Sequence, residues 1–596
     1  MNATVLQQNP QSPLGSHGTL TTVLRKVAEL SPATSGIICD HRILNYQDLD
    51  MAARRLARNL IASGICPDDR IALHMRNGPE LAIGYFACFY AGAIAVPVNT
   101  RLKGPEIEYV LGHSAASIYF GEPGLFDEIE EIRPRLANIR RFIVGPQDFE
   151  DCQDRSALAS LPIVAADRPA VILYTSGTTS RPKGVVHTHR TFLNAARGCG
   201  LAADDVAVIV TPMVHAAGLA TLIACVDAGA SAVIPERLEA DAVLDAIAGH
   251  RGTFLLGMPV TYRALIDAQN ARPRELPAAT RYLASGDSVP PALKEEFARC
   301  FGRPLREAFG TTETGMVAAS GCVAASHLDA FGRAVPGVDI AVVNEDGDPV
   351  PLGAMGEMLV RSGAVTVGYW NDPAATGEAF ADGWYRTGDL VSQDFDGNLR
   401  FHGRKKEIIV RGGSNISPQE VEAVLYEHPA VQEAGVIGEP HRLWGERVVA
   451  FVSRRRGHAV TADELIAFVA ARVAAYKVPE EIVFLGVLPK GASGKILRRA
   501  LRRPHSRAGE ALGRPIGRLF GRWWRGPDGQ LVRSWELKRA RETGRRPLAS
   551  GRVGSSTRAR PVGQEPSHSR FEALWRGVGA WLVAGFAIAG AAYFLG

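Results

Sequence analysis

Short runs of Val, Ile, Leu and Ala recur along roughly the first 400 residues, and the stretches between them space their apolar residues three or four positions apart. A short apolar run bounded by turn residues is typical of a buried strand, whereas the wider spacing is typical of an amphipathic helix. The pattern predicts strands at 70–75, 93–98, 170–175, 206–212 and 231–235. It predicts helices at Tyr46–Ser63, Pro79–Ala91 and Asp241–His250. Because strands alternate with helices, we expect an α/β fold of layered subdomains with largely parallel sheets.

The pattern changes near residue 403 and indicates a second, smaller domain. Residues 408–438 read as a strand, a turn, a helix and a strand. The helix start is well marked, because Ser417 is followed by Pro418 and Glu420. A second helix at Ala462–Val473 and two short strands follow. This arrangement predicts a small α+β domain.

The positive charge of the chain is concentrated in its tail. Residues 501–576 carry eighteen Lys and Arg against six Asp and Glu, whereas the rest carries 49 against 56. The net charge of +5 therefore hides a mildly acidic body. Arg, Gly, Pro and Ser dominate the tail, a composition typical of a disordered segment. The run RLFGRWWRGPDG would also suit nucleic acid, but we favour a membrane-related role and do not expect a nucleic-acid partner.

The last twenty residues, 577–596, contain no charged side chain. A helix of that length would span about 30 Å, the thickness of the hydrocarbon core of a bilayer. The basic stretch before it would keep the body on the cytoplasmic side. We therefore predict a transmembrane anchor and membrane contact through the tail. The alternative is a hydrophobic extension that packs on the body.

These observations divide the chain into five segments. They are a large N-terminal domain at 18–402, a hinge at 403–407, a small mobile C-terminal domain at 408–502, a basic tail without order at 503–576 and the anchor at 577–596.

The eight cysteines are scattered and form no C-x-x-C pair, so we expect neither a zinc site nor a disulfide framework. The first residues lack the basic start and apolar run of a secretory signal, so we expect a cytoplasmic protein.

The strongest single motif is Tyr174–Val185, with the sequence YTSGTTSRPKGV. An apolar strand runs there into a loop of hydroxyl residues and glycine. Such a loop can approach phosphate closely, because Gly177 has no Cβ and because hydroxyl and backbone N–H groups donate hydrogen bonds. Lys183 adds a positive charge. The motif is not a Walker loop, and taken alone it is also typical of a polar surface turn.

Six further motifs decide between these interpretations. They are YAGAIAVPVNTRLKGPEIEYVL (90–111), PMVHAAG (212–218), FGTTETG (309–315), YRTGDL (385–390), GRKKEIIVRGGSNISPQEVE (403–422) and LPKGASGKILRR (488–499). In this order they resemble the adenylate-forming superfamily of acyl-CoA synthetases, peptide-synthetase adenylation domains and luciferases. The resemblance covers about residues 18–502 and is closest to free-standing acid–CoA ligases. It implies an AMP-forming ligase that uses ATP, Mg²⁺ and coenzyme A.

The resemblance also implies the residues that bind the nucleotide. It places the β- and γ-phosphates on Thr175, Ser176, Gly177, Thr178, Thr179 and Lys183. It places the base in a slot formed by Ser285, Gly286, Phe309, Gly310 and Thr312, and the ribose on Asp389 and Arg404. Glu313 would hold Mg²⁺, a hard ion that prefers oxygen ligands, and would take part in catalysis. Phe309 replaces the more frequent Tyr of the family, and Asp287 replaces a small residue, which leaves local detail of the slot open.

Lys495 is the catalytic residue that the resemblance implies most directly. Attack of a carboxylate on the α-phosphate brings two negative groups together, and a cation between them stabilises the charge of the transition state. After acyl-AMP forms, the small domain would turn about Lys406 and present the face with Gly412 and Gly413 to the thiol. His215 would line the acid pocket and is included among the catalytic residues.

The neighbours of His215 are small and uncharged, which favours an acid with an apolar chain or ring. The motifs contain no Asp that could pair with an α-amine, so amino acids are disfavoured. We expect fatty acids first, with aryl acids of the benzoate or cinnamate kind as the alternative. We expect coenzyme A as the thiol, because GEPHRLWGERVVAFV (438–452) resembles the free-standing ligases. A ligase that loads a carrier protein is the other alternative.

Overall fold

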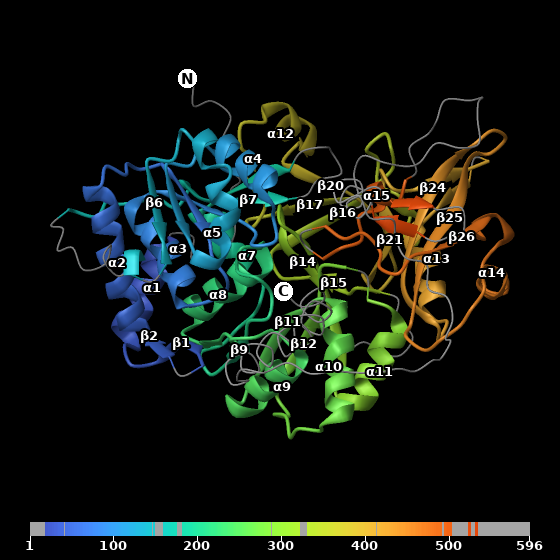
Figure 1. Cartoon of the computed structure of the whole chain (residues 1–596), viewed down its shortest axis with the longest axis horizontal. Helices are drawn as coiled ribbons and strands as arrows, with labels where there is room; N and C mark the ends of the chain where they lie inside the picture. The colour runs from blue at the N-terminus through green and yellow to red at the C-terminus, as the bar shows by residue number, and fades with distance from the viewer. Residues whose placement is uncertain are drawn as a thin grey trace, which may run out of the picture. The chain divides into compact units, whose positions relative to one another are not determined.

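The computed structural model describes residues 18–40, 42–145, 147–149, 159–175, 182–287, 289–321, 330–412, 414–491, 494–502, 523–525 and 531–533. Residues up to Arg502 belong to one compact unit, and Arg503–Phe586 belong to a second unit, which is treated separately below. The described part of the first unit contains a large N-terminal domain with three sheets and a smaller C-terminal domain with one (Figure 1).

The largest sheet has nine strands in the order β15-β14-β13-β12-β11-β9-β10-β1-β2. Their bounds are Arg333–Ala334, Gly315–Ala319, Leu305–Thr311, Arg281–Ala284, Phe254–Gly257, Val206–Val208, Ser231–Val233, Ser35–Cys39 and Arg42–Asn45. The strands from β13 to β1 are parallel, and β2, β14 and β15 run antiparallel at the two edges. The predicted strand at 206–212 is shorter than expected, because the chain leaves the sheet after Val208.

The second sheet has seven strands in the order β18-β8-β7-β4-β3-β5-β6. Their bounds are Gly368–Tyr369, Lys183–Thr188, Pro169–Thr175, Ile94–Pro97, Arg70–His74, Ile118–Gly121 and Arg141–Val144. The strands from β7 to β6 are parallel, whereas β8 and β18 are antiparallel to their neighbours. The β7–β8 hairpin therefore ends the parallel part of this sheet at the motif predicted to bind phosphate.

Helices connect and cover these two sheets. They are α1 (Leu20–Leu30), α2 (Tyr46–Ala62), α3 (Pro79–Ala91), α4 (Gly104–Ser114), α5 (Pro123–Glu130), η1 (Arg133–Arg135), α7 (His189–Arg197), α8 (Ala216–Ala228), α9 (Ala240–Gly249), α10 (Pro259–Ala271) and α11 (Pro291–Phe301). The three predicted helices are confirmed as α2, α3 and α9 to within one residue at each end. Every residue of α3 except Glu80 is buried, as expected for a helix that is apolar on all sides and packs between layers.

The third sheet departs from the predicted parallel arrangement. It contains β16 (Val338–Val343), β17 (Met355–Ser362), β19 (Phe380–Ala381), β20 (Trp384–Gln393) and β21 (Leu399–Arg404), with the short helix α12 (Pro373–Ala379) before β19. Every pairing in it is antiparallel. Short connections such as the one from β20 to β21 allow only antiparallel neighbours, because a parallel crossover needs a longer connection.

The C-terminal domain is built on a long antiparallel hairpin. Its elements are β22 (Ile409–Arg411), β23 (Ser414–Ile416), α13 (Pro418–Tyr426), β24 (Val431–His441), β25 (Gly445–Arg454), α14 (Ala462–Ala470), η3 (Ala475–Lys477), β26 (Glu481–Phe484) and α15 (Arg498–Leu501). Ser417 caps α13 by accepting from the N–H of Glu420, which confirms the predicted helix start. The strand β25 was not predicted, and α14 ends three residues earlier than predicted.

The second unit contains one described feature, an antiparallel pair of β27 (Trp523–Arg525) and β28 (Leu531–Arg533). These six residues depart from the prediction of a tail without order. The predicted anchor at 577–596 lies outside the described residues. Within the described ranges, none of the helices has both the length and the apolar character needed to cross a bilayer. The six described cysteines are free.

Candidate active site

Asp389 and Arg404 face each other across the strands β20 and β21. Nε of Arg404 lies 3.1 Å from Oδ1 of Asp389, whose side chain is only 2% exposed. The second carboxylate oxygen, Oδ2, is buried and has no hydrogen-bond partner among the described residues. Burial raises the pKa of Asp389 to about 6, although nearby Arg404 and Lys495 lower it. A buried carboxylate with a free acceptor fits a ligand that brings hydroxyl donors, such as a ribose.

Glu313 lies in the tight turn between β13 and β14. The turn is closed by bonds from the N–H and hydroxyl of Thr311 to the hydroxyl of Thr314, at 3.2 and 3.0 Å. Gly315 has φ of +65°, and a Cβ there would approach Cβ of Ala195 to 2.8 Å, so glycine is required. The backbone can therefore form the turn that carries Glu313 only because residue 315 is glycine.

A buried histidine holds the same turn from the side of β8. Nε2 of His187 donates to the carbonyl oxygen of Thr312 over 2.7 Å, and Nδ1 lies 3.1 Å from the hydroxyl of Thr191. Burial lowers the pKa of His187 to about 4, so the ring is neutral near pH 7. The bond to a carbonyl requires the tautomer with hydrogen on Nε2, since a carbonyl only accepts.

One tyrosine, Tyr369, links Glu313 to Lys183. The hydroxyl of Tyr369 donates to Oε1 of Glu313 over 3.2 Å and lies 3.1 Å from the hydroxyl of Tyr385. Nζ of Lys183 lies 4.6 Å from the centre of the Tyr369 ring, within the range of a cation–π contact. Lys183 and Glu313 are thus brought together through one ring, although 130 residues separate them in the sequence.

The donor set around Glu313 fits Mg²⁺ only in company with a nucleotide. In the part of the chain that the structure describes, no three His, Cys, Asp or Glu side chains gather closely enough to hold a metal ion. Mg²⁺ commonly uses one or two carboxylates together with phosphate oxygens and water. One carboxylate at Glu313 agrees with that kind of site, in which the bound ion neutralises phosphate charge.

The predicted slot for the base is formed by two neighbouring strand ends. The N–H of Ser285 donates to the carbonyl of Gly257 over 2.9 Å, which continues the β11–β12 pairing. Gly286 has φ of +91°, a conformation that favours glycine. Phe309 lies on β13 with its ring 4.8 Å from that of Phe331, so its orientation is fixed by packing within a small aromatic cluster.

His215 lies at the residue before α8, in the motif predicted to line the acid pocket, and its side chain makes no capping hydrogen bond. Nδ2 of Asn99 donates to Nε2 of His215 over 3.3 Å. Burial, together with the charges of Arg101 and Lys495, lowers the pKa of His215 to about 4. His215 is therefore a neutral ring near pH 7. A Cβ at Gly218 would clash with the carbonyl of Pro212, which explains the glycine at this close approach.

The loop of Lys495 lies against the N-terminal domain. A Cβ built on Gly494 would stand 3.7 Å from Nη1 of Arg101 and 3.9 Å from Cε of Met258. Lys495 keeps contact with solvent, but the surrounding protein and the charge of Arg404 lower its pKa. Three carboxylates oppose this effect and lie within electrostatic range of the ammonium, namely Asp287, Asp389 and Glu313. The predicted catalytic lysine is thus within electrostatic range of the two carboxylates predicted to bind ribose and metal.

Other predicted residues are placed differently. Lys406 is exposed in the turn after β21 and lies on the path between the two domains rather than with the charged cluster. Thr175 and Lys183 are paired across the β7–β8 hairpin. The loop residues Ser176, Gly177, Thr178 and Thr179 lie outside the described residues, as does Gly413.

Sequence reasoning missed several side chains that contact the predicted site. Tyr369, His187 and Asn99 each bond directly to a predicted residue or its turn. A signal was available for Asn99, because it lies within one of the quoted motifs. None was available for Tyr369, since only the pairing of β18 with β8 places its ring beside Lys183.

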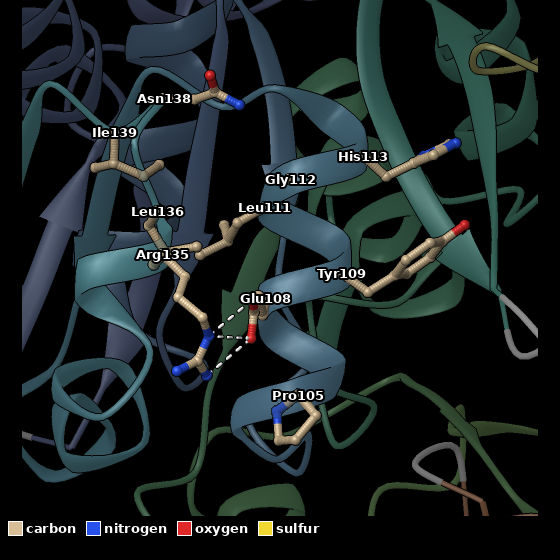
Figure 2. Close-up of a pocket in the computed structure, with 10 residues that line it drawn as sticks. All are labelled: Pro105, Glu108, Tyr109, Leu111, Gly112, His113, Arg135, Leu136, Asn138 and Ile139. Carbon is tan, nitrogen blue, oxygen red and sulfur yellow. Dashed lines mark hydrogen bonds and ion pairs between the residues drawn. The ribbon is translucent and has the colours of Figure 1, made fainter.

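A cavity of about 510 Å³ lies apart from these residues, between α4 and η1 (Figure 2). None of its lining residues is among the predicted site residues. Its α4 wall nevertheless includes Tyr109 and His113, whose side chains contact the β7–β8 hairpin. The cavity itself is therefore not the candidate active site, but its wall adjoins that site.

Comparison with known proteins agrees with this geometry. The pattern of the family "AMP-binding enzyme" matches residues 24–370, and that of the "AMP-binding enzyme C-terminal domain" matches residues 420–495. An indoleacetate–CoA ligase of Aromatoleum aromaticum is 36% identical over 79% of this chain and 94% of the relative. The fatty acid–[acyl-carrier-protein] ligase ScoC of Streptomyces coeruleorubidus is 33% identical over 80% of this chain and 94% of the relative.

Solved structures of CoA ligases are also similar to this chain. The crystal structure of a benzoate CoA ligase from Burkholderia xenovorans LB400 is similar to this chain with a TM-score of 0.74 and 31% sequence identity. The similarity covers 82% of this chain and 100% of the benzoate CoA ligase. It therefore extends over both domains, not only the larger one.

Proposed function

Because this chain belongs to the AMP-binding enzyme family and is an ATP-dependent, AMP-forming acid–CoA ligase, we propose which residues carry its two half-reactions and which acids it activates. ATP and coenzyme A are its co-substrates, and Mg²⁺ is the usual metal of such enzymes. The observation that carries the proposal is the gathering of Lys495, Asp389, Arg404 and Glu313 at one place.

In the first half-reaction the carboxylate of the acid attacks the α-phosphorus of ATP, and pyrophosphate leaves. Lys495 places its ammonium between the two negative groups and stabilises the charge of the transition state. Oδ2 of Asp389 accepts from a ribose hydroxyl and orients the nucleotide. Glu313 would hold Mg²⁺, which would neutralise phosphate charge, and Thr175 and Lys183 would lie at the phosphate loop. Residues 176–179 are assigned to the same loop by the motif alone.

In the second half-reaction the thiol attacks the acyl carbonyl and AMP leaves. We assign the hinge to Lys406 and its neighbours, with domain boundaries at 402 and 408 as the motifs predict. An exposed apolar group, Val410, Leu443 and Trp444, lies beside Gly412 on the small domain, and the N–H of Gly412 donates to the carbonyl of Trp444 over 2.7 Å. This group suits contact with a ligand after the domain has turned, because exposed apolar patches commonly mark binding surfaces.

We propose that the acid has one carboxylate and an apolar body, either a fatty chain or an aromatic ring. The neutral ring of His215 and the small, uncharged residues after it support this class, because such side chains suit an apolar group. Both an aryl acid and a fatty acid appear in the names of similar proteins. Because ATP and coenzyme A are cytoplasmic metabolites, we place the reaction in the cytoplasm.

The test is pyrophosphate release by the purified full chain with ATP and Mg²⁺ across a panel of fatty and aryl acids. Parallel reactions with coenzyme A are analysed for the thioester by mass. A thioester with one class of acid would support the proposal and identify that class. Pyrophosphate release that does not depend on any acid in the panel would contradict it.

A second candidate acceptor is a carrier protein. It is favoured by the similarity to ScoC, whose name assigns it an acyl-carrier-protein substrate. The same assay discriminates the two acceptors, because a carrier-protein ligase would release pyrophosphate with the acid but form no coenzyme A thioester. Adding a phosphopantetheinylated carrier protein would then yield the acylated carrier.

A further inference from the structure

We propose that Tyr109 and His113 of α4 are positioning residues for ATP, because they hold both sides of the β7–β8 hairpin next to Thr175 and Lys183. This inference rests on the proposed function, in which Thr175 and Lys183 face the phosphates of ATP. The two residues would not touch the nucleotide. They would act by fixing the positions of Thr175 and Lys183 at the ends of β7 and β8.

Each side of the hairpin receives one hydrogen bond from α4. The hydroxyl of Tyr109 donates to the carbonyl oxygen of Pro182 over 3.0 Å. The hydroxyl of Tyr174 lies 2.8 Å from Nδ1 of His113. Pro182 and Tyr174 directly precede Lys183 and Thr175, which are paired in the hairpin. Because Tyr174 is paired with Gly184, the two bonds act on opposite sides of the Thr175–Lys183 pair, one on each arm of the hairpin.

The rings that carry these groups restrain each other. Tyr109 and His113 are four residues apart and so share one face of α4. Their ring centres are 5.2 Å apart with an angle of 21° between the planes. Tyr174 meets both rings edge-on, at 6.4 and 5.8 Å. A ring packed on two others has little rotational freedom, so its polar atom stays in place.

The helix itself is a rigid base for the pair. Ile107, Val110 and Leu111 of α4 are almost fully buried in a hydrophobic core. On another face, Glu108 accepts from Nε of Arg135 at 2.9 Å on both oxygens. Figure 2 shows Tyr109 and His113 leaving α4 on the side away from Arg135. The helix is thus anchored by contacts other than those of the two rings.

The consequence concerns the phosphate end of ATP rather than the adenosine end. Nζ of Lys183 lies over the ring of Tyr369, whose hydroxyl bonds to Glu313. A displaced hairpin would move the ammonium relative to the carboxylate assigned to Mg²⁺. Asp389 and Arg404 lie in another sheet and would be unaffected. Loss of the α4 contacts should therefore weaken ATP binding and spare AMP binding.

Calorimetric titration of the full chain with ATP and with AMP, each with Mg²⁺, tests whether the α4 contacts affect ATP binding alone. Tyr109→Phe and His113→Phe keep the rings but each remove one hydrogen bond, so we expect Kd for ATP to rise about fivefold, as expected for one neutral hydrogen bond. Kd for AMP should stay within about twofold. His113→Asn places an amide near the position of Nδ1 and should retain the affinity for ATP, which a purely structural role of the ring would not explain.

Tyr119→Phe is the matched control. It removes a hydroxyl that lies 2.8 Å from Nδ1 of His74, in the same sheet but away from the hairpin. Its ATP affinity should equal that of the wild type. Equal loss of ATP and AMP affinity in the α4 variants, or an unchanged Kd for ATP, would overturn the inference. A wild-type chain that binds ATP but activates no acid would contradict the proposed function alone, because this titration needs no acid.

Discussion

Arg498 and Glu407 are joined by an ion pair of 2.8 Å, although 91 residues separate them in the sequence. Glu407 directly follows the exposed Lys406, and Arg498 lies three residues after Lys495. The pair therefore ties the end of the proposed hinge to the segment of the proposed catalytic lysine. On the other side of Lys406, the N–H of Lys405 donates to the carbonyl of Gly388 over 2.8 Å. Lys406 thus stands between two anchored neighbours, which suits a pivot.

The guanidinium of Arg498 also neutralises the buried carboxylate of Glu422. We therefore predict that Arg498 contributes to the stability of the fold. Nη2 of Arg498 lies 2.7 Å from Oε2 of Glu422, which is 10% exposed. Arg498→Met would leave that carboxylate buried without its partner, so we expect the free energy of unfolding to fall by about 3 kcal/mol. Urea unfolding monitored by circular dichroism measures the change. Adding Glu422→Gln should restore part of the loss, and a single variant as stable as the wild type would contradict the role of the pair.

Lys495→Ala should separate the two half-reactions. Because the ammonium acts on the attack at the α-phosphate, we expect pyrophosphate release to fall at least about 100-fold. Thioester formation from supplied acyl-AMP should stay near the wild-type rate. Rapid-quench assays of each half-reaction measure both. Arg456→Ala removes an exposed cation from the same domain and serves as the control. Equal loss of both steps would show that Lys495 does not act in adenylation specifically.

Asp389 predicts pH-dependent nucleotide binding. Burial raises the pKa of this carboxyl to about 6, above its ordinary value, so the folded protein without nucleotide holds the proton below that pH. Because the folded pKa is raised, stability falls as the pH rises from the ordinary pKa of the carboxyl to about 6, and a ribose that bonds to the carboxylate offsets this cost. We therefore expect the thermal stabilisation by AMP to grow as the pH rises from about 5 to about 7. Asp389→Asn cannot ionise, so its smaller stabilisation should lose the part of the pH dependence that comes from Asp389 and keep only that of the AMP phosphate.

His187 predicts an effect on the metal requirement. Its bond to the carbonyl of Thr312 holds the turn of Glu313. His187→Leu removes this donor, so we expect the Mg²⁺ concentration for half-maximal pyrophosphate release to rise about fivefold, the effect of one lost hydrogen bond. His187→Gln offers an amide near Nε2 and should restore most of the wild-type requirement. A leucine variant with lower activity but the same Mg²⁺ requirement would contradict this role.

Much of the fold could be predicted because local patterns agree with the tertiary structure. The helices α2, α3 and α9 begin and end close to their predicted bounds, and Ser417 caps α13 as expected. The antiparallel third sheet could not be predicted in this way. A strand's apolar pattern does not state the direction of its neighbour, which depends on the length of the connection and on the packing of the whole sheet.

The sequence by itself determined the family, the reaction class and the identity of the candidate residues, because spaced motifs such as YRTGDL and SGK are read directly from the chain. Only the tertiary structure decided which of these residues meet. Among the described residues, it placed Lys495 within electrostatic range of Asp389, left one oxygen of Asp389 without a hydrogen-bond partner, and set Tyr369 between Lys183 and Glu313. The physical reason is that burial and contacts between distant segments set charge, pKa and hydrogen bonding, and no local pattern encodes them.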